Sequence, residues 1–600
     1  MNNRQKFRNT LKTIKYTFDF VWKRKKGKKY ICIQAIHPFL EILPMVLSVV
    51  VPGALINELI YQRRLNVLVL FVAALIVIPF VKQIIVGRLN VFLTKINLDL
   101  SAELKQEFNE HVASMNYETL EDPKIQVLRT RARDSFINPL KTIDKLSSFA
   151  NAIIGLIVVS SIIMTLSPLI LVLISLVIII NSLITSRLNY KLFLYGKKIS
   201  ECDRGLVPFA GILTQLIYAK EVRLFDLKKY FSEIILKKET EINKYKLDKQ
   251  KDQYYANVGH NITNLFQQAI LYIYLIFCVL TRGLTVGDMS IFLSSISRVS
   301  SSLNNIVNTY IAFSKDSLNI QEMIDFMNIP LDQHNGGTRI PIFNNSSRIE
   351  FKNVSFKYPG SDSYALKNVS IVIHSGSKIC VVGENGAGKS TFINLLTRLY
   401  TPTEGEILLN DININEYDYL LYQKLFSPVL QDFCLYELSL AENIILACQY
   451  DEQLVEKVCN KSGLSAMIEN LPKSYDTRLG KVTDPKGIIP SGGEAQKIAI
   501  ARALYRDTPI VILDEPTAAL DPLSEYEIYT QFHKMVTDKT AILITHRLSA
   551  VQLADKVAVF DNGSVVEYGT HKELYEKGGI YTEMFDKQAQ FYRDEIVSKD

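Results

Sequence analysis

The stretch GENGAGKST, residues Gly383 to Thr391, decides the fold of the second half of this chain. It fits the pattern G-x-x-x-x-G-K-[ST] and follows the apolar run Ile379–Val382, which is the strand, loop and helix context of a phosphate-binding loop. The glycines let the backbone wrap closely around phosphate, and the helix N-terminus adds a positive dipole. Lys389 supplies a charge for the β- and γ-phosphates, and the Ser390 hydroxyl supplies a ligand for Mg²⁺. The sequence therefore predicts an ATP site.

A second apolar run, Val511–Leu513, ends in Asp514 and Glu515. A strand that ends at this point places Asp514 as a hard oxygen ligand beside the same Mg²⁺ ion. Glu515 is then a candidate to polarise the water that attacks the γ-phosphate. The two motifs together are far more specific than the loop pattern alone, so we expect the chain to bind ATP with Mg²⁺ and to hydrolyse it.

Charge and cysteine content exclude several other classes of protein. The net charge is +7, and many of the basic residues crowd into Lys23–Lys29, directly before an apolar segment. Such a cluster indicates an anchor at anionic lipid headgroups, and we expect no nucleic-acid partner. The seven cysteines include no C-x-x-C pair, which argues against a zinc site and a disulfide framework.

The first half of the chain holds six segments of about 20 residues, long enough to span a membrane. With a cytoplasmic N-terminus, the two long charged connections and the C-terminus also lie inside. These connections are amphipathic, so we expect the spanning helices to continue into the cytoplasm, with tips near Tyr117–Pro123 and Gln215–Glu221. The predicted spans are 31–56, 67–88, 147–166, 168–188, 262–281 and 289–312; the predicted domains are a basic segment 1–29, a membrane domain 30–325, a linker 326–347 and a nucleotide domain 348–600.

The last predicted span carries polar residues at steps of three and four, so they share one helical face. An arginine at the bilayer centre costs about 2.5–3.5 kcal/mol on insertion scales, which favours a water-filled substrate cavity over lipid. The alternative is a seam between helices joined by small and polar side chains. We favour the cavity, because the stripe runs several turns and carries a charge; its residues are Ser294, Arg298, Ser301, Asn305 and Asn308.

Further motifs follow the same order as in a known family. Phe356-Lys357-Tyr358 precedes the phosphate loop, Gln431 follows an apolar run, and Ser491-Gly492-Gly493-Glu494 begins a helical run. Asp521 and the pair Thr545-His546 complete the set. In order and spacing these motifs resemble the ATP-binding cassette of ABC transporters, and with six spans in front the whole chain resembles a bacterial half-exporter. The resemblance implies an all-α polytopic membrane domain of the type I exporter kind, followed by an α/β P-loop ATPase domain.

The resemblance also implies a role for each matching residue. Tyr358 stacks on adenine, Gln431 touches Mg²⁺ and the attacking water, and His546 contacts the γ-phosphate. Ser491, Gly492 and Gly493 complete the site of the opposite subunit, and Asp521 contacts the dimer partner. The implied catalytic residues are Glu515, His546, Gln431 and Lys389; the implied metal ligands are Ser390, Gln431 and Asp514; the implied nucleotide-binding residues are Tyr358, Gly383, Asn385, Gly386, Gly388, Lys389, Ser390, Thr391, Gln431, Ser491, Gly492, Gly493, Asp521 and His546.

The segment before the long helical run departs from the family pattern Leu-Ser-Gly-Gly-Gln, since it begins with Pro490 and ends with Glu494. Proline fixes φ and removes an N–H, and the glutamate adds negative charge near a polyphosphate. A lone cassette cannot close its own site, so the resemblance implies a dimer. We predict a homodimer; the alternative is a heterodimer in which this chain keeps the catalytic glutamate and carries the altered segment.

The stretch Ala518–Tyr529 and the lead-in Asp484–Gly487 are similar to those of lantibiotic and other peptide exporters. This similarity predicts export of a peptide of the bacteriocin kind across a bacterial plasma membrane, by a multi-pass protein with both termini in the cytoplasm. The alternatives are an exporter of amphipathic drugs or of lipids, or a regulatory half of a heterodimer. Membrane lipid is an expected partner in each case.

Overall fold

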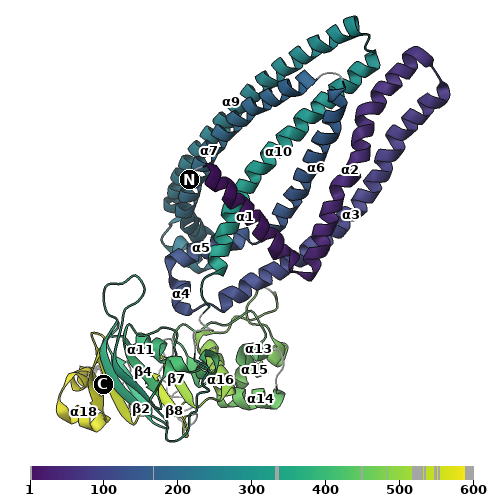
Figure 1. The fold of residues 1–600 in the computed structure, drawn as a ribbon. Helices are drawn as coiled ribbons and strands as arrows, with labels where there is room; N and C mark the ends of the chain where they lie inside the picture. Colours follow the sequence, from purple (N-terminus) through teal and green to yellow (C-terminus); the bar gives the residue numbers. More distant parts are fainter. Residues whose placement is uncertain are drawn as a thin grey trace. The chain divides into compact units, whose positions relative to one another are not determined.

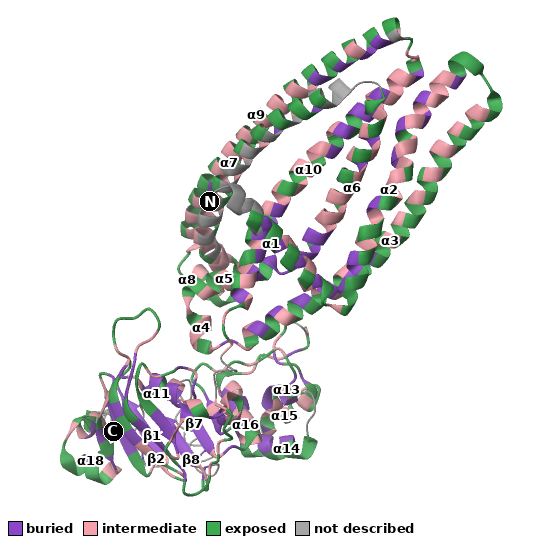
Figure 2. Ribbon diagram, viewed as in Figure 1, coloured by how far each residue is buried: buried purple, intermediate pink, exposed green. Residues whose placement is uncertain are grey.

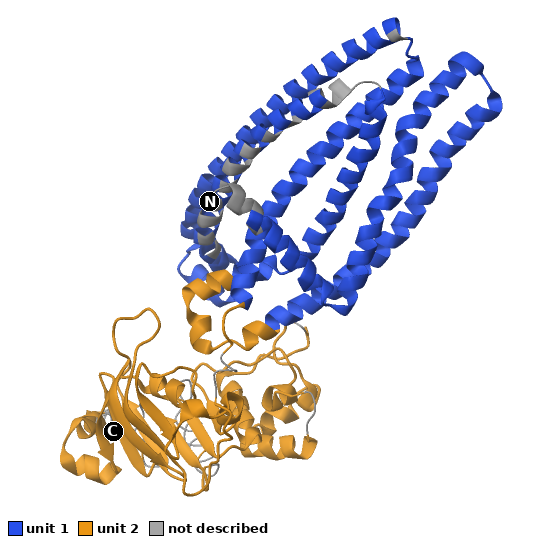
Figure 3. Cartoon of the chain, viewed as in Figure 1, with its two compact units in different colours: residues 1–109, 130–327 blue, residues 110–129, 328–600 orange. Residues whose placement is uncertain are grey.

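The computed structural model describes residues 3–165, 168–331, 337–447, 451–482, 484–515, 532, 536–545, 551 and 554–587. The chain divides into two compact units (Figure 3). Unit 1 comprises 1–109 and 130–327, and unit 2 comprises 110–129 and 328–600. Residues 110–129 interrupt the predicted membrane domain, yet they group with the nucleotide domain.

Long helices make up unit 1 (Figure 1). Apolar segments of this length satisfy their backbone hydrogen bonds internally as helices, which is the requirement for spanning lipid. The predicted continuation of spans into the charged connections is confirmed by α3 and α9, which are 49 and 55 residues long. The helices are α1 (Asn3–Trp22), α2 (Lys25–Asn57), α3 (Leu65–Ala113), α6 (Asn138–Met164), α7 (Pro168–Thr214), α8 (Ala219–Leu224), α9 (Lys228–Arg282) and α10 (Val286–Met327).

By length and composition, four helices of the described residues can cross a membrane: Lys25–Gln62, Leu65–Ala113, Asn138–Met164 and Lys228–Thr281. The predicted span 168–188 lies in α7, where Ile174–Thr185 forms a shorter apolar stretch. The predicted span 289–312 lies in α10, whose polar stripe makes it less apolar. The count of six therefore stays a prediction.

The core of unit 1 lies between α2, α6, α7, α9 and α10. Met45, Val159, Leu275 and Phe292 are buried there. In contrast, the most apolar stretch of α3 has no buried residue, and exposed residues run along α3 and α9 (Figure 2). Exposed apolar area of this extent indicates contact with lipid or with another chain.

The described residues of unit 2 form two sheets. The antiparallel sheet has the order β2-β1-β4-β5, and the six-stranded sheet has the order β10-β9-β3-β8-β7-β6, in which β6, β7, β8, β3 and β9 run parallel. The strands are β1 (Arg348–Phe356), β2 (Leu366–His374), β3 (Lys378–Gly383), β4 (Glu404–Leu409), β5 (Ile412–Asn413), β6 (Phe426–Val429), β7 (Ile510–Asp514), β8 (Thr540–Ile544), β9 (Lys556–Asp561) and β10 (Ser564–Gly569).

The core of unit 2 explains the apolar runs that mark the strands. β7 and β8 are buried along their whole length, as strands of a covered parallel sheet are. Phe392 lies 4.6 Å from the ring centroid of Phe351 on β1 and 5.4 Å from that of Phe560 on β9, so it joins the two sheets. The helices are α4 (Tyr117–Glu121), α11 (Lys389–Leu396), α12 (Tyr419–Gln423), α13 (Leu440–Ile445), α14 (Glu452–Lys461), α15 (Ser465–Glu469), α16 (Gly492–Arg506) and α18 (His571–Lys577), and α5 (Pro123–Ser135) runs from this unit into the other.

Sheet register brings the two sequence motifs to one edge. Asp514 at the end of β7 pairs with Ile544 of β8, and Ile544 pairs with Val381 of β3. The carboxyl ends of β3 and β7 therefore lie at the same edge, which is where open parallel sheets bind ligands.

Candidate functional site

The phosphate loop joins β3 to α11, and the side chain of Lys389 folds back onto the loop backbone. Lys389 Nζ donates hydrogen bonds to the carbonyl oxygens of Gly383 and Glu384, at 2.8 and 3.0 Å. Gly383 and Gly388 have φ of +154° and +100°, and a Cβ on Gly388 would lie 2.6 Å from Leu366 Cδ2. Both positions therefore require glycine. Burial lowers the pKa of the lysine, an effect opposed by the carboxylates at the end of β7.

Asp514 has the features of a metal ligand. Its side chain is buried, and in the described part of the chain Oδ1 has no hydrogen-bond partner. Burial raises its pKa to about 6, the charge of Glu515 adds to that shift, and Lys389 opposes it. The Ser390 hydroxyl also hydrogen-bonds this carboxylate. An orphaned carboxylate oxygen beside a hydroxyl is the hard-oxygen donor set that Mg²⁺ prefers, so these residues fit the ion.

Glu515 and Gln431 meet next to this position. Gln431 Nε2 donates to Glu515 Oε2 at 3.1 Å, although 84 residues separate them in sequence. Glu515 has φ of +46°, in the left-handed region that non-glycine residues rarely adopt. The amide of Glu515 is held by the Ile544 carbonyl oxygen at 3.0 Å, which fixes this unusual conformation. Strained backbone held by its surroundings is frequent at functional sites.

Tyr358 is fixed at the rim of the phosphate loop. Its hydroxyl shares a 2.9 Å hydrogen bond with Thr391 Oγ1, and its ring meets that of Tyr400 edge-on, with centroids 5.3 Å apart. The Tyr400 hydroxyl donates to the Glu121 carboxylate, and the Tyr117 ring lies 5.6 Å from that of Tyr400. The expected loop tip Tyr117–Pro123 thus contacts the neighbour of Tyr358. Sequence reasoning missed Tyr400, because its partner lies 279 residues away.

The glycine pair predicted to serve a second subunit begins α16. Gly492 and Gly493 are its first residues, and Ser491 is its N-cap. Ser491 Oγ and Glu494 hydrogen-bond each other, a capping box that the pattern Ser-x-x-Glu signals in sequence and that sequence reasoning missed. Asn385 and Gly386 lie in the phosphate loop as predicted, whereas Asp521 and His546 lie outside the described residues.

The polar stripe of α10 faces away from the helix packing within this chain. Its members are exposed except Ser294, which is half-buried, while Ile296 and Val299 on the opposite side of the helix are buried. The cavity role stays a prediction. Sequence reasoning missed a polar contact nearby, where Gln267 Nε2 of α9 donates to Ser300 Oγ at 3.1 Å. The exposed members are Arg298, Ser301, Asn305 and Asn308.

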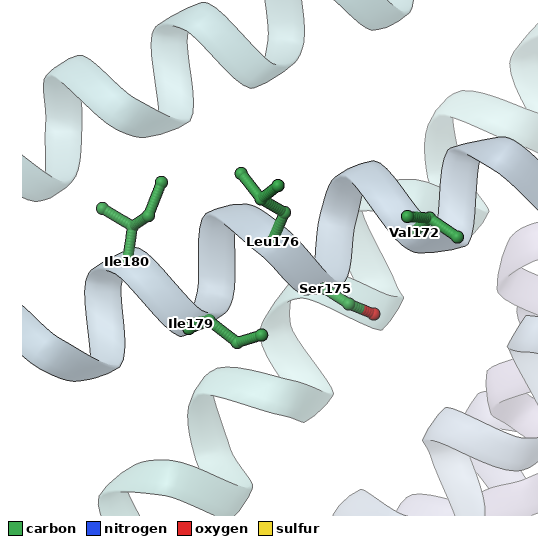
Figure 4. Close-up of a pocket in the computed structure, with 5 residues that line it drawn as sticks. All are labelled: Val172, Ser175, Leu176, Ile179 and Ile180. Atoms are coloured by element: carbon green, nitrogen blue, oxygen red, sulfur yellow. The ribbon is translucent and has the colours of Figure 1, made fainter.

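One apolar pocket lies along α7 (Figure 4). It has a volume of about 560 Å³ and a single polar side chain, Ser175, in its lining. An apolar lining of this kind accepts hydrocarbon and gives no specificity for charge. The other lining residues are Val172, Leu176, Ile179 and Ile180.

Comparison with known proteins accounts for this geometry. Residues 366–518 match the family model described as ABC transporter. The chain carries an ABC transporter domain. The subtilin transport ATP-binding protein SpaT of Bacillus subtilis is 28% identical over 557 residues, which cover 91% of this chain and 89% of that protein. The match to SpaT therefore extends over both the ABC transporter domain and the helical segment that precedes it in this chain.

Other relatives cover less of the chain. The ATP-dependent lipid A-core flippase of Haemophilus ducreyi is 34% identical over 329 residues, which are 54% of this chain and 56% of the flippase. That of Escherichia coli K12 is 34% identical over 308 residues, 51% of this chain and 52% of the flippase. The chain thus matches about half the length of these flippases.

A solved structure of a bacterial Atm1-family ABC exporter with ATP bound has the same fold. Its TM-score is 0.80, with 22% identity, and the match covers 94% of this chain and 98% of that one. The type I exporter fold predicted from the sequence is confirmed. The chain is an integral membrane protein with an ABC transporter ATPase domain, which supports ATP hydrolysis coupled to transport. Exporters of this type act as dimers.

Proposed function

We propose that this ABC exporter moves a peptide across the bacterial plasma membrane, powered by ATP bound at the carboxyl edge of β3 and β7. The observation that carries the ATP site is the meeting of the phosphate loop, the orphaned Asp514 oxygen and the Gln431–Glu515 pair. The choice of a peptide as the substrate rests on the match to SpaT, which extends over 91% of this chain. A lipid is the second candidate, because the flippases have the higher identity over the part that they cover.

The residues of the site have separate tasks in this proposal. Lys389 leaves the two loop carbonyls and neutralises the phosphates, while Glu515, oriented by Gln431, accepts a hydrogen bond from the attacking water. Ser390, Asp514 and Gln431 would hold Mg²⁺, which supplies charge neutralisation on the transferring phosphoryl group when bound. Tyr358 offers its ring to adenine. Asp521 and His546 keep their proposed dimer and γ-phosphate roles.

The working unit we propose is a homodimer with both termini in the cytoplasm. In this homodimer Ser491, Gly492 and Gly493 of one copy complete the site of the other; in each copy they lie at the start of α16 rather than in the phosphate loop. In the heterodimer alternative, this chain contributes Glu515 to one site and the altered segment at Pro490 to the other.

The test is to reconstitute the chain alone in lipid nanodiscs and measure ATPase activity against Glu515→Gln. Turnover that depends on Glu515 supports the homodimer, whereas a folded, ATP-binding but silent sample supports the heterodimer. Inverted vesicles with the same two proteins then receive labelled subtilin or labelled lipid A. ATP-dependent uptake of the peptide in wild type alone supports peptide export; movement of the lipid alone would replace it with the second candidate.

A further inference from the structure

Glu494 and Ser491 bond each other at the N-terminus of α16. The Ser491 hydroxyl and the Ser491 N–H both donate to Glu494 Oε2, at 2.8 Å each. In return, the Glu494 N–H donates to Ser491 Oγ at 3.4 Å. Glu494 therefore already accepts the hydrogen bond of the Ser491 hydroxyl. Both side chains belong to the segment proposed to complete a second copy's ATP site.

The start of a 15-residue helix is a place where negative charge is stabilised. Its first amides lack partners within the helix, and the aligned peptide dipoles add partial positive charge there. A phosphate group and a carboxylate use the same donors at such a position. In this chain the carboxylate of Glu494 is already present, and it adds a full negative charge beside the hydroxyl.

We propose that Glu494 is an internal competitor of the γ-phosphate for Ser491. When two cassettes close on ATP, Ser491 Oγ must exchange the carboxylate of Glu494 for a phosphate oxygen, and the two negative groups repel each other. Glu494 is therefore a positioning residue that raises the ATP concentration at which the dimer closes. This inference rests on the proposed role of Ser491 in the partner's site.

A glutamine at position 494 separates this role from a purely structural one. A glutamine at the third helical position also forms a capping box, so Glu494→Gln keeps the cap and removes the charge. The chain offers a matched control on α13, where Ser439 N–H donates to Glu442 Oε2 at 2.8 Å and Glu442 N–H donates to Ser439 Oγ at 3.1 Å. Glu442→Gln makes the same chemical change away from the proposed site.

The experiment measures ATPase activity against ATP concentration for the full chain in nanodiscs, in wild type, Glu494→Gln and Glu442→Gln. Removal of a like charge from a charge-assisted contact predicts a half-maximal ATP concentration about fivefold to tenfold lower in Glu494→Gln, with kcat changed less than about twofold. Glu442→Gln should match wild type. ATP-driven closure is measured by cross-linking between copies in a Glu515→Gln background. It should also require a lower ATP concentration with Glu494→Gln than with the wild-type residue or with Glu442→Gln.

Two results would overturn the proposal. One is a Glu494→Gln variant whose ATP dependence and closure equal those of Glu442→Gln, since Glu494 is then only a helix cap. The other is a silent wild type that Glu494→Gln does not activate or close. Failure of the proposed function is distinct from both, because it appears as ATPase activity that persists in Glu515→Gln.

Discussion

At the residue scale, the phosphate loop depends on backbone conformations that side chains oppose. Gly386 and Gly388 both have positive φ, but a Cβ would meet nothing within 4 Å at Gly386 and would collide with Leu366 at Gly388. A side chain at position 386 would therefore meet backbone strain alone, whereas one at position 388 would meet both strain and steric crowding.

Gly388→Ala should destabilise unit 2 by about 1–3 kcal/mol, the cost of a strained backbone plus displacement of Leu366. Gly386→Ala should cost about 1 kcal/mol, since it adds strain alone. Thermal unfolding of the two variants in nanodiscs measures the difference. Equal losses would show that Leu366 moves aside without cost.

Lys389→Ala should weaken ATP binding at least about tenfold, because a lysine at this point in a phosphate loop neutralises the β- and γ-phosphates. Titration with a fluorescent ATP analogue measures the affinity. Lys367→Ala removes an exposed charge from β2 of the same unit and serves as the control. Unchanged affinity in Lys389→Ala would contradict the assignment of the loop.

At the element scale, α4 lies in the segment 110–129 of the first long charged connection, which belongs to unit 2. Tyr400 holds it through a hydrogen bond to Glu121 and a ring contact with Tyr117. The same tyrosine packs on Tyr358, so the proposed adenine-binding ring and α4 share one neighbour.

Tyr400→Phe keeps the ring contacts and removes the hydrogen bond to Glu121. We expect basal ATPase activity to change less than about twofold while stimulation by transported substrate falls, because α4 is then held by the ring contact alone. Tyr364→Phe removes a similar phenol–carboxylate bond, 2.8 Å to Glu404, at an exposed position and is the control. Full substrate stimulation in Tyr400→Phe would refute this role.

Two buried cysteines mark the core elements β3 and α14. Burial raises the pKa of the Cys380 and Cys459 thiols to about 12. Both should stay unmodified by maleimide at pH 8 in the folded protein, whereas exposed Cys434 reacts; mass spectrometry of peptides measures this. Because the folded state retains these protons longer than the unfolded state, both thiols lower stability as pH rises from about 9 towards 12. Rapid labelling of Cys380 would place β3 outside the core.

At the scale of the whole molecule, two exposed surfaces of unit 1 indicate contacts that a single chain does not make. They are the polar stripe of α10 and the exposed apolar area. A polar stripe suits water or a polar substrate, and the apolar area suits lipid or a second copy. In the proposed homodimer, lipid, the second copy and a water-filled cavity would provide these surroundings.

Arg298→Ala should change substrate-stimulated ATPase activity more than basal activity, because the exposed guanidinium is proposed to face the transported substrate. Arg298→Lys retains the charge and should keep at least part of the stimulation. Nanodisc ATPase assays with and without peptide measure both. If basal and stimulated rates fall in parallel, the stripe is a packing seam.

Most of the ATP site could be predicted from local sequence. Asp514 ends a buried strand, and Lys389 and Ser390 begin the helix after the glycine-rich loop; such boundaries carry strong periodicity and glycine signals. The helix that follows Ser491 and the continuation of α3 into the charged connection were predicted from helical periodicity. The count of spans could not be settled in this way, because the stripe that predicts a cavity in α10 also lowers its apolar character.

The sequence by itself determined the order of the elements, the phosphate loop and the residue types of the catalytic edge, because each depends on neighbours within a few positions. Only the tertiary structure decided which distant side chains meet. Gln431 reaches Glu515 because β6 and β7 pair in parallel, and Tyr400 reaches Glu121 because residues 110–129 group with unit 2. Such contacts join positions that are far apart along the chain, and strand order and packing bring them together without leaving a periodic signal in sequence.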